Sequence, residues 1–250
     1  MPDTHGGNIF KFSHDHKINL SEVTDFSANI NLLGPSPKGL EALNERLRYI
    51  SHYPDVTNDD VMNTIADVYG IEKDSILLGN GAAELIYAVG RLSGFTGAFV
   101  PAPGFSEYQA SMDAANIPVR EIFYRQRQDD DGTPYFEVPY LALQTFAAEL
   151  KGQDGRIIVF LGNPNNPDGT LLDKQSIKVL AQMLKDANSL LVIDESFIDF
   201  IGDESLRDNS YSMRELINQY DNVIIVHSFT KFYAVPGLRI GAVFANPTLI

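Results

Sequence analysis

A lysine beside hydroxyl side chains is the group in this sequence best suited to covalent chemistry. Residues 228–231 are Ser-Phe-Thr-Lys, directly after an apolar run, and Arg239 follows Lys231 by eight residues. Most lysines lie in water and keep their charge. Between two apolar strands, however, a lysine is poorly solvated, so its amine can lose the proton and act as a nucleophile. Lys231 is therefore a candidate nucleophile.

An acidic pair ends a second apolar run. Residues 191–193 are Leu-Val-Ile, and Asp194 and Glu195 follow them. A carboxylate at the end of a buried strand is costly unless it is paired. It could cap a helix or bind a metal ion, or it could face a cationic group of a ligand. The residues alone leave these possibilities open.

Two turns could also bind a ligand. Residues 77–83 lead from a predicted strand through a glycine turn into a helix, which places the N–H groups of Gly81, Ala82 and Ala83 at a positive helix end. This arrangement suits a phosphate, although it could be an ordinary tight turn. Residues 163–167, Asn-Pro-Asn-Asn-Pro, follow another predicted strand. They suit a simple turn, but an asparagine held between prolines could also donate a hydrogen bond to a ligand.

The elements that must position these groups alternate between strands and helices. Short apolar runs predict strands at Ser75–Leu78, Ala98–Val100, Val119–Phe123, Ile157–Leu161, Leu190–Ile193, Val223–Val226 and Ile240–Ala245. Helical patterns lie between most of these strands, for example at Ala82–Leu92, Leu172–Lys185 and Met213–Gln219. The alternation predicts an α/β fold with a largely parallel sheet covered on both faces. Such sheets bind ligands at the carboxyl ends of their strands, and the candidate groups follow predicted strands.

The remaining segments are less regular. We expect an irregular N-terminal arm over residues 1–35 and one large domain over residues 36–250. Apolar residues at helical spacing predict one helix after Ser36 and a second helix that ends at Gly70. The polar segment Arg125–Tyr140 is expected to be an exposed loop, whose aspartate run forms a solvated turn in preference to a metal site.

The composition argues against several classes of function. The chain has 250 residues, 44% of them hydrophobic, so it can bury a sizeable core. The formal net charge of −14 disfavours nucleic acid and anionic membranes as partners. There is no cysteine, hence neither a disulfide nor a thiolate site, and no metal is expected. With no membrane span and no signal-peptide pattern in the sequence, we expect a cytoplasmic enzyme.

The order of the candidate groups is more specific than any one of them. A helix opened by glycine, an Asn-Pro turn, an aspartate at a strand end and Ser-x-Thr-Lys with a later arginine resemble the fold-type I pyridoxal-phosphate enzymes. Within them, the sequence resembles the branch of histidinol-phosphate aminotransferase over essentially the whole chain. The resemblance is most specific between Lys231 and Arg239, and it implies pyridoxal 5′-phosphate as the cofactor.

The resemblance also implies roles for individual residues. Lys231 would form a Schiff base with the cofactor and then act as general base and acid. Asp194 would pair with the pyridinium nitrogen, and Asn166 would donate a hydrogen bond to the phenolate oxygen of the ring. Phe105 would stack on the ring, with plain core packing as its alternative role. The cofactor phosphate would be held by the glycine turn, the lysine segment and the arginine: Gly81, Ala82, Ala83, Ser228, Thr230 and Arg239.

Two parts of the resemblance imply structure outside this chain, namely a second subunit and a further domain. Tyr53 matches a tyrosine that reaches the phosphate in the neighbouring subunit, which implies a homodimer with shared sites. The family continues past the position of Ile250 into a small domain that supplies the arginine for the substrate carboxylate. Pro247, two residues after a predicted strand, also looks like the start of another helix. We therefore expect the sequence to be truncated, and we assign no residue to that carboxylate.

Two features narrow the resemblance to threonine-phosphate decarboxylase of the cobalamin pathway. Residues 5–8 (His-Gly-Gly-Asn) and 25–31 (Asp-Phe-Ser-Ala-Asn-Ile-Asn) look like stretches that help to form its substrate pocket. Phe197 stands where histidinol-phosphate aminotransferases usually carry a tyrosine. These features imply a lyase that converts O-phospho-L-threonine to 1-aminopropan-2-yl phosphate, with His5 and Asn29 as substrate-pocket candidates. The alternatives are an aminotransferase acting on histidinol phosphate or a similar amino acid, and a non-catalytic cofactor-binding fragment.

Overall fold

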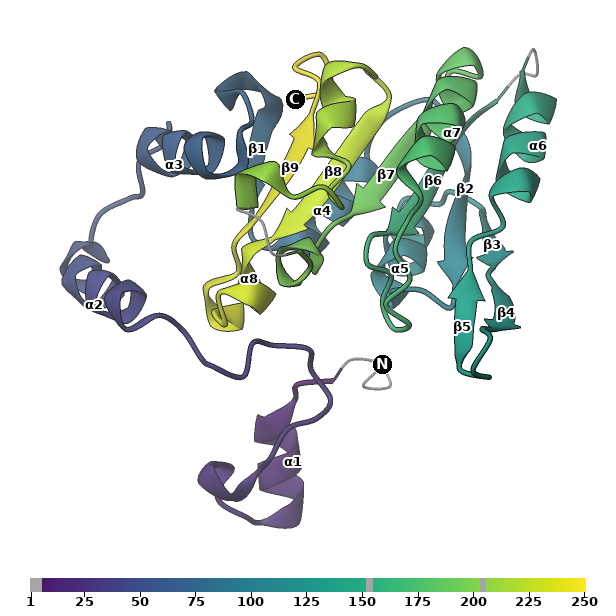
Figure 1. Ribbon diagram of the computed structural model, residues 1–250. Helices are drawn as coiled ribbons and strands as arrows, with labels where there is room; N and C mark the ends of the chain where they lie inside the picture. Colours follow the sequence, from purple (N-terminus) through teal and green to yellow (C-terminus); the bar gives the residue numbers. More distant parts are fainter. Residues whose placement is uncertain (1–5, 152–154, 203–205) are drawn as a thin grey trace.

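A seven-stranded sheet forms the centre of the computed structural model, which describes residues 6–151, 155–202 and 206–250. Its strand order is β1-β9-β8-β7-β6-β2-β3 (Figure 1). The strands are β1 (Ile76–Gly79), β2 (Phe95–Ala102), β3 (Val119–Phe123), β6 (Arg156–Gly162), β7 (Leu190–Asp194), β8 (Val223–Ser228) and β9 (Gly241–Ala245). Strands β3, β2, β6, β7 and β8 are parallel, whereas β9 runs antiparallel to both β8 and β1. The predicted α/β fold with a largely parallel sheet is confirmed.

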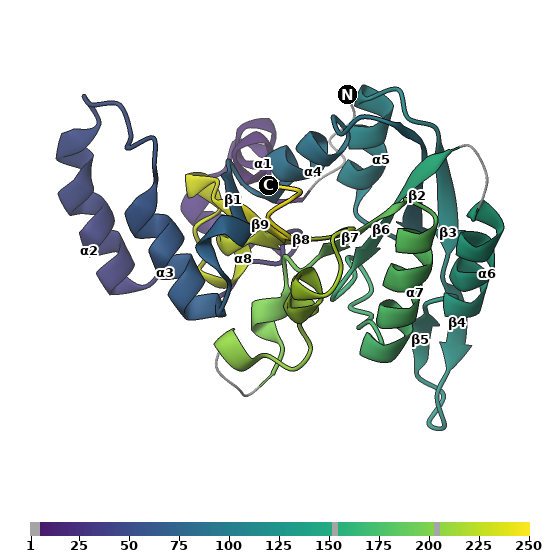
Figure 2. The same ribbon diagram turned by 90° about the horizontal axis from the view of Figure 1, so that it is seen from above.

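Helices cover both faces of this sheet. They include α3 (Asp59–Tyr69), α4 (Ala82–Val89), α5 (Ser106–Ala114), α6 (Tyr140–Leu150) and α7 (Lys174–Asp186). Figure 2 shows α4 and α5 on one side of the sheet and α6 and α7 on the other. Along β6, Ile157, Val159 and Leu161 pack into the core under α6 and α7, while Ile158 and Phe160 pack into the core under α4 and α5. Burial on both faces explains why this strand is a continuous apolar run.

The parallel strands bring the candidate chemical groups to one edge of the sheet. Strand β6 ends at Gly162, β7 at Asp194 and β8 at Ser228. Gly162 is paired with Asp194, which is paired in turn with Val226. The Asn-Pro turn, the acidic pair and the lysine segment therefore begin side by side, as the carboxyl edge of a parallel sheet requires.

The N-terminal segment extends away from the sheet. Figure 1 shows α1 (Ile9–His16) and α2 (Pro37–Arg46) projecting from the body, and neither helix contains a buried residue. The expectation that the first residues are irregular is wrong for α1. This helix is capped by Asn8, whose side chain accepts a hydrogen bond from the Lys11 N–H. Such a cap favours a helix even where the composition is polar. The division of the chain at residue 35 stays a prediction.

Most of the segment Arg125–Tyr140 is exposed, although Val138 is buried, and it is not a loop as expected. It contains an antiparallel hairpin formed by β4 (Arg125–Gln128) and β5 (Pro134–Glu137). The aspartate run lies in its turn, where Gly132 has a φ of 87°. Nearly every side chain of the two strands faces solvent, so the sequence lacks the alternation of apolar and polar residues that marks a half-buried strand.

Some helix bounds also differ from the predictions. The helix predicted at Leu172–Lys185 begins at Lys174, because the Asp173 side chain accepts a hydrogen bond from an N–H of the first turn and caps it. The segment Met213–Gln219 forms a short 3₁₀ helix, Arg214–Asn218, in place of an α-helix. Across the described part of the chain, every helix is too short or too polar to cross a membrane.

Candidate active site

Lys231 lies in α8 (Phe229–Phe232), a single helical turn that follows β8 directly. Ser228 caps this turn, and its Oγ accepts a hydrogen bond of 3.0 Å from Lys231 Nζ. Burial lowers the pKa of Lys231, the Asp194 carboxylate opposes that shift, and the charge of Arg239 adds to it. The amine is thus held in a fixed position where its neutral form is favoured relative to a lysine in water.

Asp194 is buried and hydrogen-bonded at the end of β7. Its carboxylate accepts one hydrogen bond from the Tyr108 hydroxyl and one from the Ser196 N–H, both of 2.9 Å. The second bond caps the turn after β7. Tyr108 stacks on Phe160 at a centroid distance of 5.1 Å and meets Phe105 edge to face at 5.7 Å. The aromatic side chains of α5 and β6 therefore fix the direction of this carboxylate.

The glycine turn and the arginine meet at the start of α4. Gly81 has a φ of 86° and a ψ of 165°, a conformation that residues with side chains rarely adopt. A Cβ atom added to Gly81 would lie 2.6 Å from Arg239 Nη2, so the guanidinium is packed against the helix N-terminus. The N–H groups of Ala82 and Ala83 belong to the same first turn. A guanidinium beside a positive helix end is suited to bind an anion.

Two buried hydroxyls adjoin this anion site. Ser228 Oγ and Thr230 Oγ1 are hydrogen-bonded at 2.8 Å. Ser228 is paired in the sheet with Gly241, and a Cβ atom added to Gly241 would lie 2.7 Å from the backbone nitrogen of Ala82. The structure therefore brings together the residues predicted around a phosphate: Gly81, Ala82, Ala83, Ser228, Thr230 and Arg239.

A cavity of about 290 Å³ is lined by both Asn166 and Asn29. Phe197 also lines it, and the centre of this ring lies 5.7 Å from Lys231 Nζ. Asn31 holds the N-terminal segment there: its N–H donates to the Lys231 carbonyl at 3.1 Å, and its side-chain amide donates to the next carbonyl at 2.9 Å. The N-terminal segment and the Asn-Pro turn therefore line one cavity, and Phe197 in its lining lies near the lysine.

Three predicted site residues stand apart from this group. Phe105 is partly buried in the core and contacts Tyr108, which binds the acid, so its stacking on a ligand ring stays a prediction. Tyr53 lies between α2 and α3 with its side chain 100% exposed. His5 lies outside the described residues.

Tyr108 and Glu195 also belong to the site, although the sequence alone predicts no role for either residue. Glu195 is fully buried and accepts hydrogen bonds from Ser212 Oγ at 2.6 Å, the Met213 N–H at 2.6 Å and Asn163 Nδ2 at 3.2 Å. Burial raises the pKa of Glu195, although these hydrogen bonds oppose the shift. Because Asn163 begins the Asn-Pro turn, Glu195 fixes the turn that carries Asn166. Its position beside a strand-end aspartate was the one signal available in the sequence.

The family model for aminotransferase class I and II matches residues 21–250. A putative threonine-phosphate decarboxylase from Caldanaerobacter subterraneus subsp. tengcongensis is 34% identical over 249 residues, which cover 100% of this chain and 61% of that protein. Histidinol-phosphate aminotransferase from Haloferax volcanii is 33% identical over 222 residues, which cover 88% of this chain and 56% of that protein. The chain thus spans less than two thirds of the length of either relative, and identity does not separate the two activities.

Solved structures of similar proteins also superpose on this chain, again over part of their own length. Histidinol-phosphate aminotransferase from Clostridium acetobutylicum superposes with a TM-score of 0.74 at 28% identity, covering 90% of this chain and 61% of that one. Histidinol-phosphate aminotransferase from Sinorhizobium meliloti, in complex with pyridoxal-5′-phosphate, superposes with a TM-score of 0.70 at 25% identity, covering 88% of this chain and 55% of that one. Together with the lysine, the strand-end acid and the anion site, these matches confirm the resemblance: the chain belongs to the aminotransferase class I and II family.

Proposed function

We propose that this chain carries the pyridoxal 5′-phosphate site of an enzyme that decarboxylates O-phospho-L-threonine. The main support is that three chemically different groups converge at one sheet edge: the amine of Lys231, the carboxylate of Asp194 and the anion site of Gly81 and Arg239. The cofactor presents an aldehyde, a basic ring nitrogen and a phosphate. Each of them has a partner of suitable chemistry here, so the residues fit the group.

The residues of the chain then have distinct tasks. When bound, pyridoxal phosphate supplies an electron-poor ring that stabilises negative charge on the α-carbon of the substrate. Lys231 binds the cofactor covalently, because its lowered pKa makes the neutral amine available. Its Nζ is also the group that can deliver a proton to the α-carbon after carbon dioxide leaves. Asp194, oriented by Tyr108, stabilises positive charge on the ring nitrogen.

The cavity supports the decarboxylase over the aminotransferase. Its lining includes Asn29, which lies in the N-terminal stretch that resembles the decarboxylases, and Phe197, which replaces the usual tyrosine of the aminotransferases. Phe197 offers no hydroxyl to the phenolate oxygen of the ring, so Asn166 is the donor proposed for that oxygen. Transfer of the amino group of histidinol phosphate or a similar amine is the second candidate, because a relative named histidinol-phosphate aminotransferase is 33% identical.

Two products distinguish the two activities. The protein is incubated with O-phospho-L-threonine or with histidinol phosphate, and both carbon dioxide and the pyridoxamine form of the cofactor are measured. We expect carbon dioxide from phosphothreonine without pyridoxamine. Rapid, stoichiometric pyridoxamine from histidinol phosphate, with no carbon dioxide from phosphothreonine, would assign the protein to the aminotransferases.

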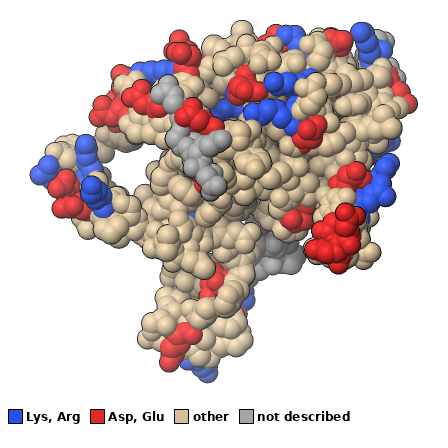
Figure 3. Space-filling model, viewed as in Figure 1, with Lys and Arg blue, Asp and Glu red and all other residues tan. Residues whose placement is uncertain are grey.

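We also propose that the site is completed in a homodimer. Large apolar side chains that are at least 85% exposed gather in the N-terminal part of the chain: Phe26, Leu32, Leu33, Ile50, Tyr53 and Val56. Figure 3 shows that most of the projecting surface around α1 is neither acidic nor basic. Folded monomers rarely leave so much apolar surface in water. A second copy of the chain would cover it and bring Tyr53 to the anion site.

The substrate gives a further reason for a dimer. The described residues that line the cavity include neither lysine nor arginine, and the whole chain carries a net charge of −14. A phosphorylated substrate therefore needs a cation from outside this lining. Sedimentation velocity tests the assembly: we expect a dimer, and a monomer with full cofactor occupancy would contradict the proposal.

A further inference from the structure

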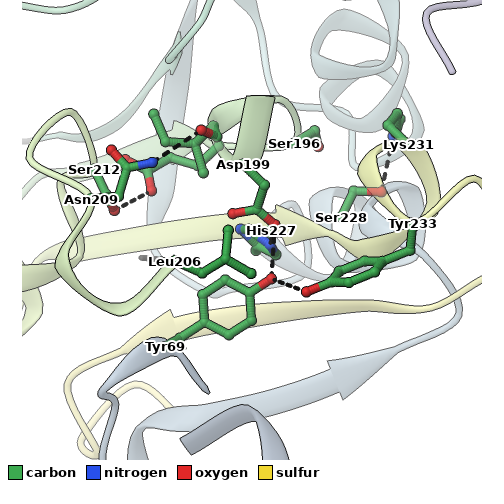
Figure 4. Close-up of polar contacts among 12 residues, drawn as sticks. Tyr69, Ser196, Asp199, Leu206, Asn209, Ser212, His227, Ser228, Lys231 and Tyr233 are labelled. Carbon is green, nitrogen blue, oxygen red and sulfur yellow. Dashed lines mark hydrogen bonds and ion pairs between the residues drawn. The ribbon is translucent and has the colours of Figure 1, made fainter. Parts of the chain in front are cut away.

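A polar cluster, buried except for Tyr233 at its rim, lies next to the lysine segment. It consists of Tyr69, Asp199, His227 and Tyr233, which we call the Asp199 cluster (Figure 4). Asp199 Oδ2 accepts a hydrogen bond of 2.7 Å from the Tyr69 hydroxyl and lies 3.1 Å from His227 Nε2. The hydroxyls of Tyr69 and Tyr233 are 3.2 Å apart. One carboxylate thus connects α3, the turn after β7, the end of β8 and the residue that follows α8.

The cluster holds the lysine segment from both ends. His227 directly precedes Ser228, whose Oγ accepts the hydrogen bond from Lys231. Tyr233 lies two residues after Lys231 and reaches the same carboxylate through Tyr69. The turn that carries Lys231 therefore begins and ends at residues connected to Asp199. A displacement of either end would move Lys231 Nζ relative to Ser228.

Packing alone does not explain polar groups at this position. The rings of Phe229 and Phe244 contact both Tyr69 and His227, so the surroundings are largely aromatic. Asp199 Oδ1 and His227 Nδ1 are buried and have no hydrogen-bond partner among the described residues. Each such atom carries a desolvation cost that no hydrogen bond offsets, and well-packed apolar residues often replace a buried charged pair without loss of stability.

Asp199 nevertheless keeps its charge. Burial would raise the pKa of this carboxyl, but the hydrogen bond from His227, together with that from Tyr69 and the nearby charge of Arg214, lowers it below its usual value. The Arg214 guanidinium lies 5.0 Å from the centre of the Tyr69 ring. A charged carboxylate that binds both donors on one oxygen has a well-defined geometry, because charge-assisted hydrogen bonds are strong and directional.

We propose that the residues of the Asp199 cluster are positioning residues for Lys231. They hold α8 in place, so that the lysine amine stays hydrogen-bonded to Ser228 and faces the cofactor. This inference rests on the proposed cofactor site and goes beyond it, since none of the four residues lies among those proposed to contact the cofactor. Tyr69 is the centre of the arrangement, because its hydroxyl connects Asp199 with Tyr233.

Tyr69→Phe tests the proposal with minimal change in packing. The matched control is Tyr140→Phe, which also removes one tyrosine hydroxyl, here the acceptor of a 2.6 Å hydrogen bond from the Asp173 N–H at the start of α7. Both variants are compared with the unchanged protein in three measurements. These are the thermal midpoint, the dissociation constant for pyridoxal phosphate, and the rate of reductive methylation of Lys231 in cofactor-free protein, followed by mass spectrometry across pH.

We expect both variants to lower the thermal midpoint and only Tyr69→Phe to affect the lysine. Its dissociation constant for pyridoxal phosphate should rise by about tenfold, less than the roughly thirtyfold effect of one charge-assisted hydrogen bond, because the lost bond acts on the cofactor only through α8. Methylation of Lys231 should require a pH higher by about one unit, because a loosened α8 admits water and raises the pKa of the amine. Tyr140→Phe should leave both quantities unchanged.

The outcomes separate this inference from the proposed function. If Tyr69→Phe changes the thermal midpoint as Tyr140→Phe does, and changes neither quantity at Lys231, the cluster is purely structural and the inference is wrong. If the unchanged protein fails to attach pyridoxal phosphate to Lys231, the proposed function fails, while the methylation profile still decides the inference. Should Tyr69→Phe not fold, Tyr233→Phe removes a hydroxyl at the exposed rim of the cluster and should shift the methylation profile in the same direction.

Discussion

Gly81→Ala is a sharp test of the anion site, because it adds a single methyl group at the contact that defines it. The new Cβ would lie 2.6 Å from Arg239 Nη2, closer than real contacts allow. The end of the arginine side chain is flexible, so we expect the guanidinium to move away and the fold to survive. The positive φ of 86° adds backbone strain of about 1–3 kcal/mol.

The displaced guanidinium should weaken binding of the phosphate. A charge-assisted hydrogen bond contributes about 2 kcal/mol, which corresponds to about thirtyfold in the dissociation constant for pyridoxal phosphate. Titration of cofactor-free protein, followed by absorbance, measures this constant. Gly132→Ala is the control for strain alone, because Gly132 has a φ of 87° and an added Cβ would meet no described atom outside the adjacent residues within 4 Å. It should destabilise the protein and leave cofactor affinity unchanged.

A second control lies in the arginine segment itself. Gly237 belongs to the 3₁₀ helix Pro236–Leu238 and has open space around it, so Gly237→Ala should change neither stability nor affinity appreciably. If Gly81→Ala loses stability like Gly132→Ala but binds pyridoxal phosphate as tightly as the unchanged protein, the guanidinium does not hold the phosphate at this position. The anion site would then have to be reassigned.

Two further predictions concern the acid and the lysine. Asp194→Asn should keep the fold, because the Tyr108 hydroxyl can accept a hydrogen bond from the new amide. It should lower turnover by about a hundredfold or more, since a buried ionic contact contributes about 3 kcal/mol. A variant with near-normal turnover would contradict the role of Asp194. Lys231→Met should raise the thermal midpoint of cofactor-free protein at neutral pH. The folded state lowers the pKa of Lys231, so the unfolded chain binds a proton at this lysine more readily than the folded chain does. The native lysine therefore destabilises the fold at pH values below its ordinary pKa, and the stability gained by Lys231→Met should vanish above that pKa. An equal gain at every pH would indicate that packing, not titration, is responsible.

Much of the sheet could be predicted because its central strands β6, β7 and β8 are buried on both faces. These three strands differ from the predictions by at most two residues at either end, and the more exposed edge strand β3 lies at the predicted residues Val119–Phe123. A continuous apolar run bounded by polar turns is a strong local signal. The chemical groups could be located for the same reason, because parallel strands place whatever follows them at one edge.

What could not be predicted depends on contacts between distant residues. Tyr108 and Asp194 are 86 positions apart, and Tyr69 and Asp199 are 130 apart, so no local pattern identifies them as partners. The hairpin of β4 and β5 lacks a buried face and hence an alternating pattern. The contact of Arg239 with Gly81 likewise requires the sheet to bring β9 next to the start of α4.

The central claim is that Lys231 binds the cofactor covalently. The protein is incubated with pyridoxal phosphate, reduced with borohydride, digested and analysed by mass spectrometry. We predict that the reduced adduct is found on the peptide that contains Lys231 and that it is lost in Lys231→Ala. A stoichiometric adduct on any other lysine, or an adduct that persists in Lys231→Ala, would contradict the account.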